Sequence, residues 1–221
     1  MRFIGLMLLI VALASASPNA FPIAQLGYAS LHDLGLFLIL PSAVLLFALG
    51  WSSARKGNGR IAGVIFQGAF AGAIATVALE AVRYPGFRLG FMPGNLPEVM
   101  GVLLLDRFAQ GPSVASSLAG FAYHFWNGAC FGIIYAALGL ARRSALWATV
   151  YGVVIGIGFL ASPVVQSLGG GFLGRDFGWH FVATVLTAHA AFGIVLGLIL
   201  SCRESCACQS RFHSLEPSRQ V

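Results

Sequence analysis

Four histidines and one glutamate stand inside or at the edge of long apolar runs: His32, Glu80, His124, His180 and His189. An ionisable side chain in such a run is costly to place in lipid, so each one is a functional-site hypothesis. Imidazole and carboxylate groups are ligands that zinc, copper, nickel and ferrous iron accept. These five residues are therefore the candidate metal ligands, although none of them has the His-x3-His spacing that would strengthen the hypothesis.

Other roles are open to the same residues. The interpretation we prefer is structural: each histidine donates a hydrogen bond to a backbone carbonyl or to Asn127 and holds two helices together. A second is haem ligation, with His124 and His189 as the two axial ligands. A third is movement of ions or protons along a polar path in the outer half of a helical bundle. That path would include His32, Asp33, Glu80, His124 and His189.

Glu80 and Arg83 are three residues apart near the end of one apolar run. Residues three apart on a helix are neighbours on one face, and opposite charges there attract each other. The spacing predicts an ion pair between them.

The C-terminal tail holds three of the four cysteines, Cys202, Cys206 and Cys208. They could bind a soft metal or act as redox thiols. They lack the paired Cys-x2-Cys spacing, so unliganded, solvated thiols are the simpler interpretation. No nucleophile–base arrangement, phosphate-binding loop or dinucleotide fingerprint is present, so nothing in the sequence indicates an enzyme.

The elements that must position these groups follow from the composition. Of the 221 residues 58% are apolar and only 9% are charged, against about a quarter charged in a soluble domain. Much of the surface must therefore face lipid. Five apolar segments approach the roughly 20 residues that cross a bilayer. The predicted fold is an all-α integral membrane bundle with spans at 31–51, 61–82, 118–140, 145–165 and 179–201.

The first 16 residues have the pattern of a signal peptide. Arg2 precedes a short apolar core that ends at the small residues Ala14-Ser15-Ala16. Pro18 and Pro22 argue against one continuous span through this region. A first helix that stays uncleaved is the alternative.

The basic residues predict the orientation of the chain. Arg55, Lys56 and Arg60 lie in one gap between spans, and Arg142 and Arg143 lie in another. Basic gaps alternate with balanced ones, as the positive-inside rule requires. The expected location is a bacterial inner membrane, with the mature N-terminus outside and the tail, residues 202–221, in the cytoplasm. Basic residues spread in this way form no patch for a nucleic acid.

The module at 61–201 has the pattern of one two-helix hairpin used twice. Each copy returns on a helix that bears His-x3-Gly-x3-Gly, beginning at His124 in the first copy and at His189 in the second. Residues four apart share a helix face, so each histidine heads a stripe of glycines that allows close helix packing. The matching small faces are expected on the partner helices, at Gly68, Gly72, Gly152 and Gly156.

The run from Gly68 through Leu200 resembles a family of small four-helix bacterial inner-membrane proteins known as a domain of unknown function. The resemblance rests on Gly72-Ala73-Ile74-Ala75-Thr76, on Met92-Pro93-Gly94-Asn95-Leu96-Pro97, on His124-Phe125 with Gly128, and on His189-x3-Gly. It implies the fold and the inner membrane, and no activity.

The expected function is a structural, accessory or partner-binding role in the bilayer, with a membrane-protein partner or a homo-oligomer as the expected assembly. The alternative is binding or transport of a metal ion or another small cation through the histidines and carboxylates.

Overall fold

The computed structural model describes residues 2–213, with side chains described for residues 3–141 and 143–201. Throughout this part of the chain the regular structure is helical, and no strand is present. The predicted all-α fold is therefore confirmed. In chain order the helices are α1 (Arg2–Gln25), α2 (Leu31–Leu34), η1 (Gly35–Ile39), α3 (Leu40–Arg55), α4 (Gly59–Arg88), α5 (Leu96–Leu104), η2 (Phe108–Gln110), α6 (Val114–Ala137), η3 (Leu140–Arg142), α7 (Ala145–Leu160), α8 (Pro163–Ser167), η4 (Phe172–Phe177) and α9 (Trp179–His213).

Five helical segments in the described part are long and apolar enough to cross a membrane. They are Phe3–Gln25, Leu31–Arg55, Gly59–Arg88, Ala145–Ser167 and Trp179–Ser201. This indicates a multi-pass membrane protein and agrees with the predicted number, but the set differs. The first segment is α1, which the sequence assigned to a signal peptide. The predicted span at 118–140 corresponds to α6, which is 24 residues long but is not among the five.

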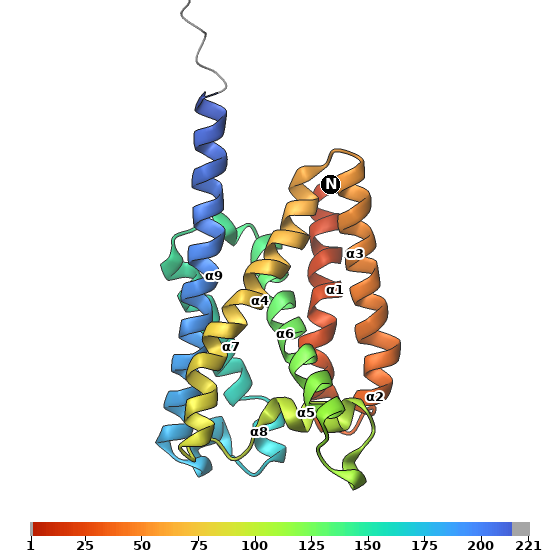
Figure 1. Cartoon of the computed structure of the whole chain (residues 1–221), viewed down its shortest axis with the longest axis vertical. Helices are drawn as coiled ribbons and strands as arrows, with labels where there is room; N and C mark the ends of the chain where they lie inside the picture. Colours follow the sequence, from red (N-terminus) through yellow and green to blue (C-terminus); the bar gives the residue numbers. More distant parts are fainter. Residues whose placement is uncertain (1, 214–221) are drawn as a thin grey trace, which may run out of the picture.

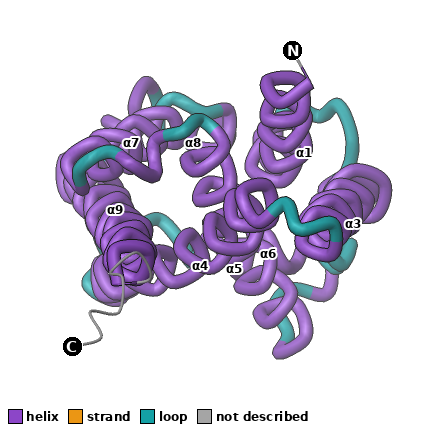
Figure 2. The backbone as a smooth tube through the Cα atoms, turned by 90° about the horizontal axis from the view of Figure 1, so that it is seen from above, coloured by secondary structure: helices purple, strands orange, loops and turns teal. Residues whose placement is uncertain are grey.

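The long helices lie side by side in two groups joined through the middle (Figures 1 and 2). The first group contains α1 and α3, and the second contains α7 and α9. Between them α4 packs closely against both α6 and α9. The short helices α2, α5 and α8 gather at one end of the bundle, and the α3–α4 connection lies at the opposite end (Figure 1).

Glycines form the contact between α4 and α6. A Cβ atom on Gly68 would meet the backbone of Gly132 and Ile133, and one on Gly72 would meet the carbonyl oxygen of Gly128. Without a hydrophobic drive between helices in lipid, such close backbone approach provides the packing that holds two helices together.

The same arrangement joins α7 to α9. A Cβ atom on Gly152 would meet the backbone of His189 and Gly193, and one on Gly156 would meet the side chain of His189. The small faces expected at Gly68, Gly72, Gly152 and Gly156 are thus confirmed as helix contacts.

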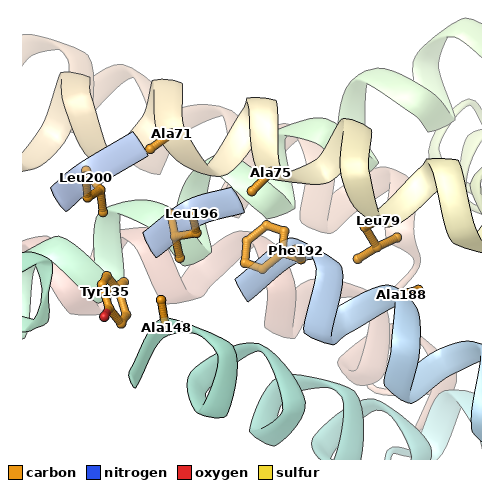
Figure 3. Packing of buried hydrophobic residues seen from close by; sticks show 9 residues of the cluster. All are labelled: Ala71, Ala75, Leu79, Tyr135, Ala148, Ala188, Phe192, Leu196 and Leu200. Atoms are coloured by element: carbon orange, nitrogen blue, oxygen red, sulfur yellow. The ribbon is translucent and has the colours of Figure 1, made fainter. Parts of the chain in front are cut away.

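A buried cluster fills the space where α4, α7 and α9 meet (Figure 3). Small residues on α4, Ala71 and Ala75, leave room for Phe192 and Leu196 of α9, which are almost fully buried. Figure 3 shows Ala148 of α7 and Tyr135 of α6 beside Leu196. This cluster therefore fixes the position of α9, the helix that carries His189.

Helix α1 runs without a break through the predicted cleavage region and contains both Pro18 and Pro22. Its buried face packs on α6 and α3. The Ser17 hydroxyl donates a hydrogen bond of 2.6 Å to Oδ1 of Asn127. The Tyr123 hydroxyl donates one of 2.8 Å to the carbonyl of Ser17. The expected interruption at the prolines is absent, whereas cleavage itself stays a prediction.

Candidate functional site

Glu80 and Arg83 form the predicted ion pair on the last part of α4. Arg83 Nε donates to Glu80 Oε1 at 2.6 Å, and Arg83 Nη2 donates to Oε2 at 2.7 Å. This bidentate geometry matches the planar guanidinium to the planar carboxylate. The side chains of Arg83 and Glu80 are only 6% and 13% exposed, so the pair lies inside the bundle rather than on its surface.

Two further residues complete the polar cluster, by which we mean Glu80, Arg83, Asn95 and His124. Asn95 Oδ1 accepts a hydrogen bond of 2.9 Å from Arg83 Nη2. His124 Nε2, on α6, lies 2.9 Å from Glu80 Oε1. This is a close electrostatic contact between the imidazole and the carboxylate. The cluster joins α4, α6 and the segment before α5.

One nitrogen of the Arg83 guanidinium has no hydrogen-bond acceptor in this cluster. Nε and Nη2 have acceptors, but Nη1 is buried without any partner. A guanidinium carries five N–H donors, and a buried donor without an acceptor costs about 1–3 kcal/mol, or more for a charged group. Such a group in a folded protein calls for an explanation.

Arg83 lines a cavity of about 500 Å³ inside the bundle. Its walls come from α1, α4, α6, α7, α8 and α9 together with the segment at 92–100. Most lining residues are apolar, and the polar ones include His124, Asn127, Ser162 and His189. The Ser162 hydroxyl is also buried without a partner. A largely apolar cavity of this size with a few polar groups is typical of a small-molecule site.

His189 is the second predicted histidine on this cavity. Its Nδ1 lies 2.8 Å from the carbonyl oxygen of Val185. Because a carbonyl only accepts, Nδ1 must carry the proton and donate it. Nε2 is then the nitrogen that remains for another partner. The ring stacks on Phe159, with 6.2 Å between centroids, and packs against Gly156.

The other two predicted histidines do not belong to this cavity. His32 Nδ1 donates a 2.9 Å hydrogen bond to the carbonyl of Leu104. His180 stacks against Phe91 and Trp179, with centroid distances of 4.7 Å and 3.7 Å. Neither lines the cavity. The hydrogen bonds of His32 and His189 to backbone carbonyls are those expected of structural histidines.

The five candidate metal ligands do not come together as one set. Only His124 and Glu80 are in contact, and in the described part of the chain no three His, Cys, Asp or Glu residues are grouped as a metal ion would require. The proposed haem ligands are no better placed, because His124 Nε2 faces Glu80. The cysteines at 202, 206 and 208 lie outside the described side chains.

The sequence identified the charged pair and both histidines but missed the rest. Asn95 carries the signal that could have found it, since it lies in a segment that follows α4 directly, where a polar side chain can turn back onto Arg83. The Ser17–Asn127 contact depends on α1, which was assigned to a signal peptide. The cavity is lined by residues from helices far apart in the chain, so no local sequence pattern predicts it.

Comparison with known proteins adds no relative: no family model, no curated protein and no solved structure matches this chain. The resemblance to the four-helix family of unknown function therefore stays a prediction.

Proposed function

We propose that this chain is an intramembrane binding protein for a small, largely apolar molecule that carries a hydrogen-bond-accepting oxygen. The observation that carries the proposal is Arg83, a residue that lines the cavity and whose buried Nη1 has no hydrogen-bond partner in the described part of the chain. An acceptor oxygen of a ligand would satisfy this donor, and the apolar walls would enclose the rest of the molecule. The Ser162 hydroxyl offers a second polar contact in the same space.

The charges of the site favour this ligand over a cation. Glu80 is already neutralised by two hydrogen bonds from Arg83 and lies against His124. A metal ion or other cation would have to displace the guanidinium, and it would meet the positive charge of Arg83 on entering. Cation binding or transport, the alternative expected from the sequence, is therefore the less favoured function.

Orientation and location follow from the basic residues as proposals. We place the end with Arg55, Lys56 and Arg60 in the cytoplasm, because basic loops stay on that side of a bacterial inner membrane. We also propose that α1 is retained, which puts both chain ends on the cytoplasmic side. Its support is the buried contact of Ser17 with Asn127.

We further propose that α4 with α6, and α7 with α9, are two copies of one hairpin. The support is that each pair meets through glycines at equivalent positions of the predicted repeat. In the first pair Gly72 contacts Gly128, and in the second Gly152 contacts His189 and Gly193.

The binding proposal is tested by purifying the full chain from its native membrane in mild detergent and releasing bound molecules for mass spectrometry. The informative variant is Glu80→Gln combined with Arg83→Met, because it removes both charges and leaves neither one unpaired. The matched control is Arg88→Met on the same helix, where the side chain is exposed. We expect the wild type and the control to retain a stoichiometric apolar molecule and the double variant to lose it.

An empty wild-type protein, or a ligand that the double variant retains fully, would contradict the proposal. The structural or accessory role expected from the sequence, which needs no bound molecule, would then be the better account.

A further inference from the structure

The helices around the cavity do not pack equally closely on all of its sides. At the end of the bundle nearest α5, the apolar residues Met92, Leu96 and Met100 line the cavity. Met92 and Met100 are less than a tenth exposed. This apolar cap separates the polar cluster from water at that end of the bundle.

The side wall between α1 and α7 is built differently. Pro18 and Pro22 of α1 and Gly158 and Phe159 of α7 all line the cavity. Helix α1 packs on α3 and α6, and α7 packs on α9, but among the described helices there is no close packing of α1 against α7. The short helix α8 and the long helix α6 each contact both of them. Figure 2 shows α1 and α7 on the two sides of α8.

Gly158 marks the edge of this wall. It lines the cavity and is an exposed residue. A Cβ atom placed on it would meet no atom within 4 Å. The other α7 glycines, Gly152 and Gly156, are buried against α9 and have no such space. Gly158 is therefore the glycine of α7 that lines the cavity with open space beside it.

We infer that the cavity opens sideways into the bilayer between α1 and α7, and that its ligand is a membrane-dissolved amphiphile. The ligand carries a carboxylate or a carbonyl oxygen, which binds the guanidinium of Arg83, and an apolar chain that extends toward Gly158. A molecule that partitions into lipid reaches this opening without crossing water, whereas the apolar cap disfavours entry from the aqueous side. This inference rests on the proposed binding function and adds the route and the class of ligand.

The first test places a spin label at the opening without any ligand. In a background with all native cysteines replaced, Gly158→Cys is labelled with a nitroxide, and Val154→Cys, one turn away on the lipid face, is the control. In phosphatidylcholine nanodiscs we expect both labels to collide with lipid-soluble oxygen and to be protected from a water-soluble nickel chelate. A label at position 158 that is accessible to the chelate but not to oxygen would overturn the lateral opening.

The second test measures binding through that opening. Gly158→Trp should plug it, whereas Val154→Trp adds the same side chain outside it. The two probes are oleic acid and methyl oleate, which are added separately to the nanodiscs and detected by native mass spectrometry. They distinguish a ligand with an anionic acceptor oxygen from one with a neutral acceptor oxygen. We expect at least one of the two to bind the wild type and the Val154 variant, with a tenfold or larger loss of binding in Gly158→Trp.

The outcomes separate the two proposals. If neither probe binds the wild type and no native molecule is retained either, the binding function fails, whatever the spin labels report. If a probe binds the wild type and binds Gly158→Trp equally well and equally fast, binding stands and the lateral route is wrong.

Discussion

Removing the positive charge of Arg83 alone should be among the most damaging substitutions in the bundle. The guanidinium donates two hydrogen bonds to Glu80 and one to Asn95, in a place where both charged side chains are nearly buried. Arg83→Met would leave the Glu80 carboxylate with only the 2.9 Å contact to His124. Leaving one member of a buried pair without its partner costs about 3–5 kcal/mol, and we expect a loss of that size in the free energy of unfolding.

The size of the pair interaction follows from a double-mutant cycle. Glu80→Gln alone should also be destabilising, because it leaves the guanidinium without its counter-charge. The combined variant should be more stable than Arg83→Met by about 1–3 kcal/mol, since it carries no unpaired charge. The assay is reversible unfolding in mixed micelles by titration with denaturing detergent, followed by circular dichroism. Arg88→Met, at an exposed position, should change stability by no more than about 0.5 kcal/mol.

Two results would refute this reasoning. One is a loss below about 1 kcal/mol for Arg83→Met, which is the range of solvent-exposed pairs. The other is strict additivity of the two single substitutions, which would mean that the two side chains do not interact.

Three further predictions concern the scaffold. Gly128→Val should lower the free energy of unfolding by about 1–3 kcal/mol, the usual cost of overpacking, because its Cβ would meet Thr76 and Gly72 of α4. Gly158→Val meets open space and should be nearly neutral. Equal unfolding midpoints for the two variants would contradict the close α4–α6 contact. Asn127→Leu should cost about 1–3 kcal/mol in the same assay, because it leaves the buried Ser17 hydroxyl without its acceptor; an unchanged midpoint would mean that α1 is not docked there. Intact-mass spectrometry of the purified protein should find residues 2–16 still attached, and a mass that lacks them would restore the signal-peptide hypothesis.

The parts of the fold that the sequence predicted are those with a short-range signature. The glycine contacts follow from four-residue spacing, which places Gly68 with Gly72, and Gly152 with Gly156, on single helix faces. The Glu80–Arg83 pair follows from three-residue spacing in the same way. Long apolar runs gave four of the five membrane-crossing segments, because length and composition suffice to recognise them.

What the sequence did not predict depends on contacts between distant segments. In the sequence Pro18 and Pro22 argue against one continuous span, yet α1 continues through both. Neighbouring helices can stabilise a helix that contains prolines, and Tyr123 of α6 donates a hydrogen bond to the Ser17 carbonyl next to Pro18. The candidate metal ligands lie apart for a related reason. Depth along a helix says nothing about which helix face a side chain occupies, and His32 and His180 face other neighbours.

The most direct test of the account is an experimental density map of the full chain in lipid nanodiscs, at a resolution that separates ligand from side chains in the cavity. The account predicts an elongated density between α1 and α7, with a polar end within about 3 Å of Arg83 Nη1. It would be contradicted by a cavity that has collapsed onto its own side chains, or by an Nη1 that is satisfied by a residue of the protein.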